Sequence, residues 1–180
     1  MTALTCIIVP MSDTDTPTIT DEHRDLLEAL QAHRGFLRHA LQGLTDDQAR
    51  QRPTVSALSV AAIVKHVAST EAGWVEFILH GADGMPNDPE AWAAEWRIDD
   101  ADTVASLLAR YDAVARRTDE LVASGLDLDA SHPLPVAPWF PPGARRSARR
   151  VLVHIVAETA QHAGHADIIR ETIDGQKTMG

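Results

Sequence analysis

The sequence has a single cysteine, Cys6, and only two lysines among its 180 residues. One cysteine excludes an internal disulfide and a metal site built from several thiolates, as expected in a reducing cytoplasm. No apolar run reaches the length of about 20 residues that a membrane-spanning helix needs. The apolar stretch Leu4–Pro10 lacks the basic start of a signal peptide. We therefore expect a cytoplasmic protein that does not span a membrane.

Positive charge is also scarce, because 16 lysine and arginine residues stand against 26 aspartate and glutamate residues, for a net charge of −10. No basic cluster exceeds the arginine pairs between Arg145 and Arg150. This balance argues against a nucleic-acid partner and against binding to an anionic membrane surface. The length is sufficient for one domain with a substantial core and is short for two.

Four long segments place apolar residues at helical spacing, and each follows a residue type that caps helix N-termini. The predicted helices begin at Thr20, at Ser56 or Ser59, at Asp102–Thr103 and at Ser147. Two long connections, residues 84–96 and 127–143, lie between them. We therefore predict an all-α fold, a four-helix bundle that forms one domain over residues 20–180. Residues 1–19 are polar, and we expect them to form a flexible leader.

Two tryptophans are candidates for contact with a bound cofactor. Trp74 lies on the inward arc predicted for the second helix, which also carries His66. Trp139 lies in the second long connection, beside Phe140 and among five prolines. Trp139 and Phe140 either line the mouth of a pocket or seal the end of the bundle, and the sequence leaves both alternatives open.

The last predicted helix carries an unusual set of polar side chains. His154, Glu158 and His162 are four residues apart, and His165 follows three residues later, so all share one face. Apolar residues such as Ile155 and Ile168 lie on or beside this face, so we expect it to point inward. Burying such groups without partners would cost several kcal/mol apiece, which a bound metal ion would avoid.

Helix geometry narrows the set of metal ligands. Residues four apart lie about 6 Å apart along the axis and can share an ion, whereas His154 and His162 lie about 12 Å apart. The pair is therefore either His154 with Glu158 or Glu158 with His162. One helix seldom completes such a site, and His66 is the best candidate for a ligand from a second helix.

These residues also carry a resemblance to a known family. The chain resembles the DinB-like superfamily of metal-dependent four-helix bundles, and within it the mycothiol-dependent branch. The similarity covers roughly residues 20–175. The matching residues are Arg52-Pro53-Thr54, Leu58-Ser59, Val64-Lys65-His66, Glu71, Trp74, Leu108 to Asp112, Val151 to Ile155, and Glu158 to Glu171.

The resemblance implies one particular ligand set. Many members of the superfamily use three histidines, whereas mycothiol-dependent maleylpyruvate isomerases and mycothiol S-transferases have a glutamate in the middle. Carried over to this chain, the metal ligands become His66, Glu158 and His162. His154 is then expected in the core or beside the ligands.

Three residues just past the ligands are candidates for a catalytic role. We expect His165, Asp167 and Arg170 to support the ligands or to contact the thiol. For Asp167 and Arg170 the alternative is an ordinary salt bridge on the surface or between helices.

Two imidazoles and one carboxylate leave a divalent ion with an open coordination position. Zn²⁺ suits these ligands best, and Ni²⁺, Fe²⁺ and Mn²⁺ accept them as well. Because a metal-bound thiol is deprotonated at neutral pH, we expect an S-transferase that activates mycothiol for attack on small electrophiles. The sequence leaves open whether the chain acts alone or as a homodimer.

Two other functions remain as alternatives. The first is a mycothiol-dependent cis–trans isomerase of a small unsaturated diacid. It ranks lower, because the inward faces show no clear arginine pair to hold two carboxylates. The second is a metal-binding bundle without catalytic activity.

Overall fold

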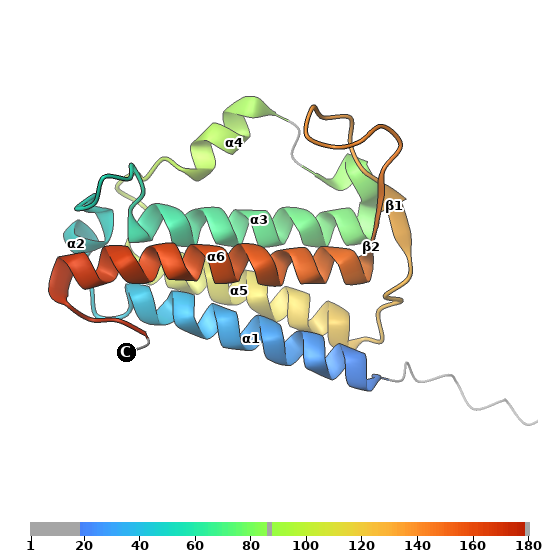
Figure 1. The fold of residues 1–180 in the computed structure, drawn as a ribbon, viewed down its shortest axis with the longest axis horizontal. Helices are drawn as coiled ribbons and strands as arrows, with labels where there is room; N and C mark the ends of the chain where they lie inside the picture. The colour runs from blue at the N-terminus through green and yellow to red at the C-terminus, as the bar shows by residue number, and fades with distance from the viewer. Residues whose placement is uncertain (1–18, 86–87, 179–180) are drawn as a thin grey trace, which may run out of the picture.

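The computed structural model describes residues 19–85 and 88–178, and in this part of the chain the predicted all-α bundle is confirmed. Its four long helices are α1 (Asp21–Leu41), α3 (Val60–His80), α5 (Val104–Ala123) and α6 (Ala148–Asp174). They lie side by side along the long axis of the molecule (Figure 1). Residues 1–18, which make up nearly all of the predicted leader and include Cys6, lie outside the described residues.

Local sequence determines where these helices begin and end. The side chains of Thr20, Ser59, Thr103 and Ser147 each accept a hydrogen bond from a backbone N–H in the first helical turn. Of the two starts predicted for the second helix, the structure selects Ser59. The last long helix ends at Gly175, whose φ of 79° lies in the left-handed region that favours glycine. None of the described helices is both long and apolar enough to cross a membrane.

The connections contain short elements in addition to the four long helices. These are α2 (Asp46–Arg50), the 3₁₀ helix η1 (Gly81–Gly84), α4 (Pro89–Glu95), and the strands β1 (Ser131–Pro133) and β2 (Arg145–Ser147). The two strands pair antiparallel, with His132 opposite Arg146, and three residues are too few to show an alternating pattern. Figure 1 shows α4 above α3, on the side of the bundle away from α1. The long connections therefore cover one face of the bundle.

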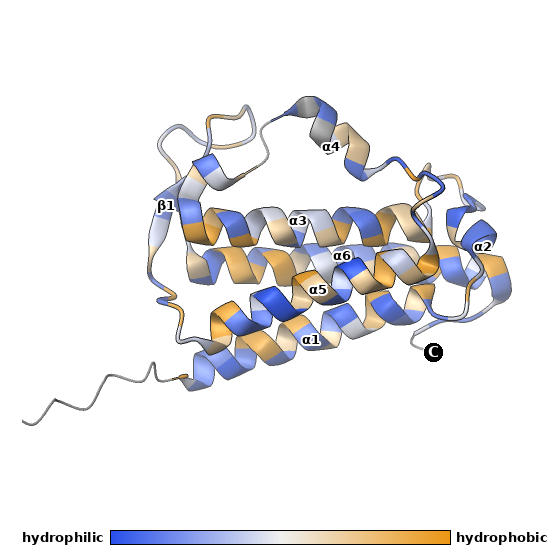
Figure 2. Ribbon diagram, turned by 180° about the vertical axis from the view of Figure 1, so that it is seen from behind, coloured by the Kyte–Doolittle hydropathy of each residue, from blue (hydrophilic) through white to orange (hydrophobic). Residues whose placement is uncertain are grey.

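The core consists of two apolar clusters, one toward each end of the bundle. One cluster gathers around Leu37, Val64 and Tyr111, and the other around Leu30 and Phe77. Figure 2 shows hydrophobic residues along the faces where the long helices meet. At roughly 25 cal/mol per Å² of apolar surface removed from water, these clusters are the main stabilising contribution to the fold.

A buried polar layer lies between the two clusters. The guanidinium of Arg34 on α1 donates to both carboxylate oxygens of Glu71 on α3 and, at 2.7 Å, to Asp119 on α5. The hydroxyl of Thr118 donates to the same Glu71 carboxylate at 2.6 Å. Arg34 and Glu71 are each 1% exposed, so this ion pair is held without water. Thr159 of α6 is buried at the same level, directly beside Glu158 in the chain.

Candidate metal centre

The structure brings together His66 of α3 and Glu158 and His162 of α6. One ligand atom from each residue lies within 4.8 Å of the other two, and all three side chains are half-buried. The Nε2 of His162 is 3.6 Å from a carboxylate oxygen of Glu158. The rings of His66 and His162 meet edge to face, with centroids 5.1 Å apart. This is the set that the resemblance implied, and of the two pairs on α6 it contains Glu158 with His162.

His154 lies next to this group but outside it. Its Nε2 is 3.8 Å from the other carboxylate oxygen of Glu158, and its ring packs against Trp74 with centroids 5.0 Å apart. Burial, together with the positive charge of Arg146, lowers the pKa of His154 below its ordinary value. This imidazole is therefore held neutral between an aromatic ring and the ligand group.

Two residues at the C-terminal end of α4 support His66, and sequence reasoning predicted neither: Glu95 is the last residue of the helix and Trp96 follows it. The Nδ1 of His66 donates to the carboxylate of Glu95 at 3.2 Å, and the ring of Trp96 stacks on the imidazole at 3.9 Å. Because a carboxylate can only accept, Nδ1 carries the proton and Nε2 keeps its lone pair, which the Thr70 hydroxyl contacts at 3.4 Å. Metal-binding histidines commonly donate their second N–H to a carboxylate in this way.

His162 and His165 occupy the other side of the group. Burial and the neighbouring imidazoles of His66 and His165 lower the pKa of His162 to about 4, so His162 is neutral at pH 7. The Nδ1 atoms of His162 and His165 are buried without a hydrogen-bond partner among the described residues. Their rings lie 5.5 Å apart between centroids. His165 is thus the one predicted catalytic residue that the structure places beside the ligand group.

The donor set fits a divalent ion. Within the described chain, the ion pairs of Glu158 are with His154 and His162, and no lysine or arginine reaches its carboxylate. Because the pKa values of both imidazoles are lowered, Glu158 has no fully charged partner within ion-pair distance at neutral pH among the described residues, and Arg146 acts on it only from farther away. A divalent cation would supply that charge, and neutral imidazole nitrogen with carboxylate oxygen is a donor set that zinc accepts.

Asp167 and Arg170 are not part of this group. Arg170 is buried and donates to Asp174, Gln176 and the backbone carbonyls at the end of α1. The carboxylate of Asp167 accepts the backbone N–H of Thr178 at 2.7 Å. Both residues therefore fasten the C-terminal end of the chain to the bundle, which matches the salt-bridge alternative for Arg170.

The ligand face of α6 is not the most buried face of that helix. Ile168, expected on the inward face, is 63% exposed, and that expectation is wrong. The fully buried stripe runs instead through Ile155, Thr159 and Ala163, one position away from Glu158 and His162. The ligand residues consequently lie beside the core rather than inside it, where a ligand can reach them.

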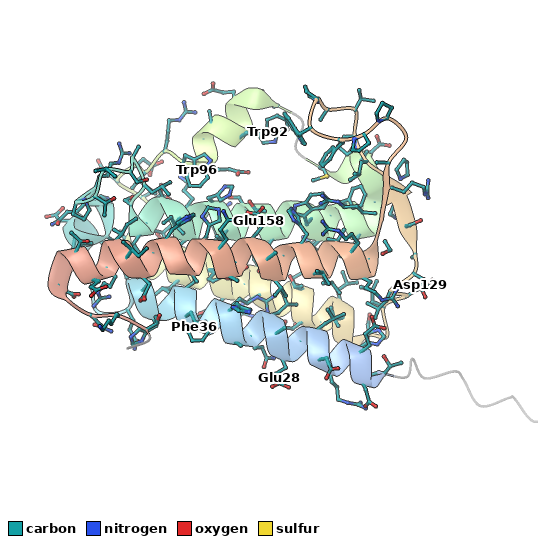
Figure 3. The ribbon with its side chains drawn as sticks, viewed as in Figure 1. Glu28, Phe36, Trp92, Trp96, Asp129 and Glu158 are labelled. Carbon is teal, nitrogen blue, oxygen red and sulfur yellow. The ribbon has the colours of Figure 1, made fainter. Side chains whose placement is uncertain are left out.

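A cavity of about 620 Å³ opens beside His66. Side chains of α3, of α4 and of residues 135–140 line it, and five of them are the aromatic rings of Trp74, Trp92, Trp96, Trp139 and Phe140. Trp74 is almost completely buried, whereas Trp139 is 62% exposed, so the aromatic wall runs from the interior to the surface. Of the two alternatives for Trp139 and Phe140, the structure favours a pocket lining. In Figure 3, Trp92 lies on α4, Trp96 lies just after its C-terminal end, and Glu158 lies below them on α6.

Arginine lies closer to this region than the sequence suggested. The guanidinium of Arg146 packs over the ring of Trp74 at 4.6 Å and over that of Phe140 at 5.4 Å. The expectation from the sequence concerned an arginine pair on the inward faces of the helices. Arg146 lies on β2, before the last helix, where helical spacing gives no guidance.

Facing helices that bring two imidazoles and a carboxylate together beside an aromatic cavity define a bundle protein with a candidate metal centre. This chain belongs to the mycothiol-S-transferase family, whose family model matches residues 25–175. Among solved structures, it is similar to a protein titled "conserved protein of locus" from Enterococcus faecalis, with 15% sequence identity and a TM-score of 0.61. That likeness covers 85% of this chain and 97% of the other, and it shows the fold alone. A search of curated proteins finds no match.

Proposed function

We propose that this protein is a metal-dependent S-transferase that joins the sulfur of mycothiol to small electrophiles. The observation that carries the proposal is the convergence of His66, Glu158 and His162 within 4.8 Å, with His66 in the wall of an aromatic cavity, in a member of the mycothiol-S-transferase family. These three residues would hold the ion, most suitably Zn²⁺, with Ni²⁺, Fe²⁺ and Mn²⁺ as alternatives. When bound, a divalent ion supplies Lewis acidity that lowers the pKa of a thiol.

The chain's own residues would position the two reactants. Glu95 and Trp96 fix the orientation of His66, and the aromatic wall from Trp74 to Trp139 excludes water from the apolar part of a ligand. In the reaction a carbon–sulfur bond forms, the bond to the leaving group breaks, and the leaving group departs with the electron pair. The thiol proton passes to solvent.

His165 offers a second route for that proton. Its Nδ1 is buried and has no partner within the described chain, and its ring lies next to His162. If the thiol needed a side-chain base, His165 would be the residue to provide it. We expect His165→Gln to change the conjugation rate little, because the metal site itself favours the thiolate. A collapse of the rate with metal still bound would assign the proton transfer to His165.

The test is metal analysis combined with a thiol-conjugation assay on the purified full-length chain. The electrophile is 1-chloro-2,4-dinitrobenzene, and mycothiol, glutathione and bacillithiol are compared as thiols. We expect about one divalent ion per chain and turnover with mycothiol above the other two. Bound metal without turnover for any thiol favours the non-catalytic bundle. Isomerisation of a cis-unsaturated diacid without net consumption of mycothiol favours the isomerase.

A further inference from the structure

A second cavity lies beside the first, at the N-terminal end of α6. It has a volume of about 730 Å³ and shares Trp74, Trp139 and Phe140 with the cavity that reaches His66. Its other lining residues are apolar except for three arginines, Arg145, Arg146 and Arg150, and the neutral His154. None of the described residues that line it is acidic. The cavity therefore combines flat aromatic walls with positive charge.

Arg146 is the most constrained of these basic residues. Its guanidinium is held over two aromatic rings, and its backbone is fixed in the β1–β2 ladder opposite His132. Its Nη1 is buried and has no hydrogen-bond acceptor among the described residues. A buried N–H donor without an acceptor is costly and uncommon in native proteins. An acceptor atom supplied by a ligand would satisfy it.

The charges around the cavity are also unbalanced. In a chain with 26 acidic and 16 basic residues, most arginines should have an acidic neighbour. Arg149 does, since it pairs with Glu22 and Asp129 outside the cavity. Within the described chain, neither Arg146 nor Arg150 has a carboxylate within the 4.0 Å of an ion pair. Both lie at the N-terminal end of α6, where the helix dipole already favours an anion.

We propose that this cavity binds the carboxylate of a flat, apolar ligand, of which an arene carboxylate is the simplest example. Arg146 and Arg150 are the contacts to the carboxylate, whose geometry matches the planar guanidinium fork. Trp74, Trp139 and Phe140 are the walls that accept the ring. The apolar walls select a ligand whose charge is confined to one end.

The position of the cavity connects it to the candidate metal centre. Arg150, His154, Glu158 and His162 follow one another at intervals of four on a single face of α6. Arg150 and Glu158 are thus about 12 Å apart along the helix axis. A ring held by its carboxylate at Arg150 extends along this face toward Glu158. The claim that this carboxylate is part of the electrophile rests on the proposed function. The claim that the cavity binds a carboxylate does not.

Binding is tested on the full-length protein, as purified, with 4-nitrobenzoate and its neutral analogue 4-nitrobenzamide. Tryptophan fluorescence quenching reports on the four tryptophans of the chain, of which Trp74 and Trp139 line this cavity, and calorimetry gives the affinity. We expect the carboxylate to bind at least about tenfold more tightly than the amide, and Arg146→Gln and Arg150→Gln each to remove this preference. Arg149→Gln is the matched control, because it removes the same charge from the same turn outside the cavity.

The proposal is overturned if the carboxylate has no advantage, or if Arg149→Gln reduces it as much as Arg150→Gln does. Arg146 is half-buried, so its variant is checked for helicity and metal content. Arg150 is exposed, and Arg150→Gln decides the matter if Arg146→Gln fails to fold.

The link to the electrophile is tested separately, with 4-chloro-3-nitrobenzoate and 4-chloro-3-nitrobenzamide as substrates and mycothiol as the thiol. Rates are divided by the uncatalysed rates, because the two rings differ in intrinsic reactivity. We expect kcat/KM to favour the carboxylate in the parent and not in Arg150→Gln. Carboxylate binding without conjugation of either compound would reject the proposed function and keep the binding site. Conjugation without a carboxylate preference would keep the function and reject the link to the electrophile.

Discussion

The Nδ1 of His66 on α3 donates to the carboxylate of Glu95 on α4 across 3.2 Å, which leaves Nε2 as the lone-pair nitrogen of that ring. Both side chains are mostly buried, with 16% and 20% of their surfaces exposed. A helix of seven residues in a long connection therefore determines the tautomer of a candidate ligand on the main bundle.

Replacing Glu95 tests this positioning role through metal affinity rather than activity. Glu95→Gln keeps the size of the side chain and removes the charge that fixes the Nδ1 proton. We expect metal affinity to fall about 10- to 100-fold, as is typical when such a carboxylate partner is lost. Competition against a chromogenic chelator measures the affinity. Glu90→Gln, an exposed acid of the same helix, is the control and should have no effect. Equal losses in both variants would mean that only the general negative charge of α4 matters.

Removal of one ligand tests the composition of the metal centre. His162→Ala should lose bound metal while far-UV circular dichroism stays close to that of the parent, because the two apolar clusters remain intact. His154→Ala is the comparison, since His154 also contacts Glu158 but lies outside the group of three. We expect it to keep its metal. Metal content after dialysis is the measurement, and loss of the ion from His154→Ala would place His154 among the ligands. Unfolding of the metal-free protein at room temperature would instead make the ion structural.

The buried pair of Arg34 and Glu71 predicts a large loss of stability on neutralisation. Glu71→Gln leaves the buried Arg34 guanidinium with only the partly exposed Asp119 as a counter-ion, and we expect the free energy of unfolding to fall by about 3–5 kcal/mol. Asp112→Asn breaks the partly exposed ion pair with Arg38 between α1 and α5, and it should cost less than about 1 kcal/mol. Urea denaturation of both variants gives the two values. Similar losses would show that the buried pair contributes no more than a surface pair.

Sequence reasoning predicted the features that depend on neighbours along the chain. The starts of the long helices follow from capping residues such as Thr103, and the shared face of Glu158 and His162 follows from the helical repeat. His66 could be assigned as the third metal ligand only through the family resemblance, because no short-range pattern in the sequence connects α3 to α6.

The contacts that sequence reasoning missed join residues far apart in the chain. Glu95 is 29 positions from His66, and Glu71 is 37 positions from Arg34, so no short-range period reveals either pair. Glu95 and Arg146 also lie outside the four predicted helices, where the sequence pattern specifies no face. Their roles depend on how α4 and the β1–β2 ladder fold back over the bundle.

The lowered pKa of His162 predicts how the stability of the metal-free protein changes with pH. Burial lowers this pKa to about 4, whereas in the unfolded chain it returns to about 6.5. Between these values the unfolded chain binds a proton that the folded chain does not, so protonation favours unfolding. The stability contributed by neutral His162 is complete above about pH 6.5 and is lost as the pH falls toward 4. With about 1.4 kcal/mol for each pKa unit, the loss amounts to at most roughly 3 kcal/mol.

Urea denaturation in the presence of a chelator, at several pH values between 7.5 and 4.5, measures this loss. His162→Gln cannot take up the proton, so its free energy of unfolding should fall less steeply over the same range. The variant should still lose some stability as the pH falls, because the pKa of His154 is also lowered and His154 remains in place. His80→Gln is the control, because the His80 side chain is 61% exposed. The slope of that control should match the parent's. If His162→Gln keeps the full slope of the parent, the pH dependence arises from other groups and His162 is not the buried neutral histidine that the structure shows.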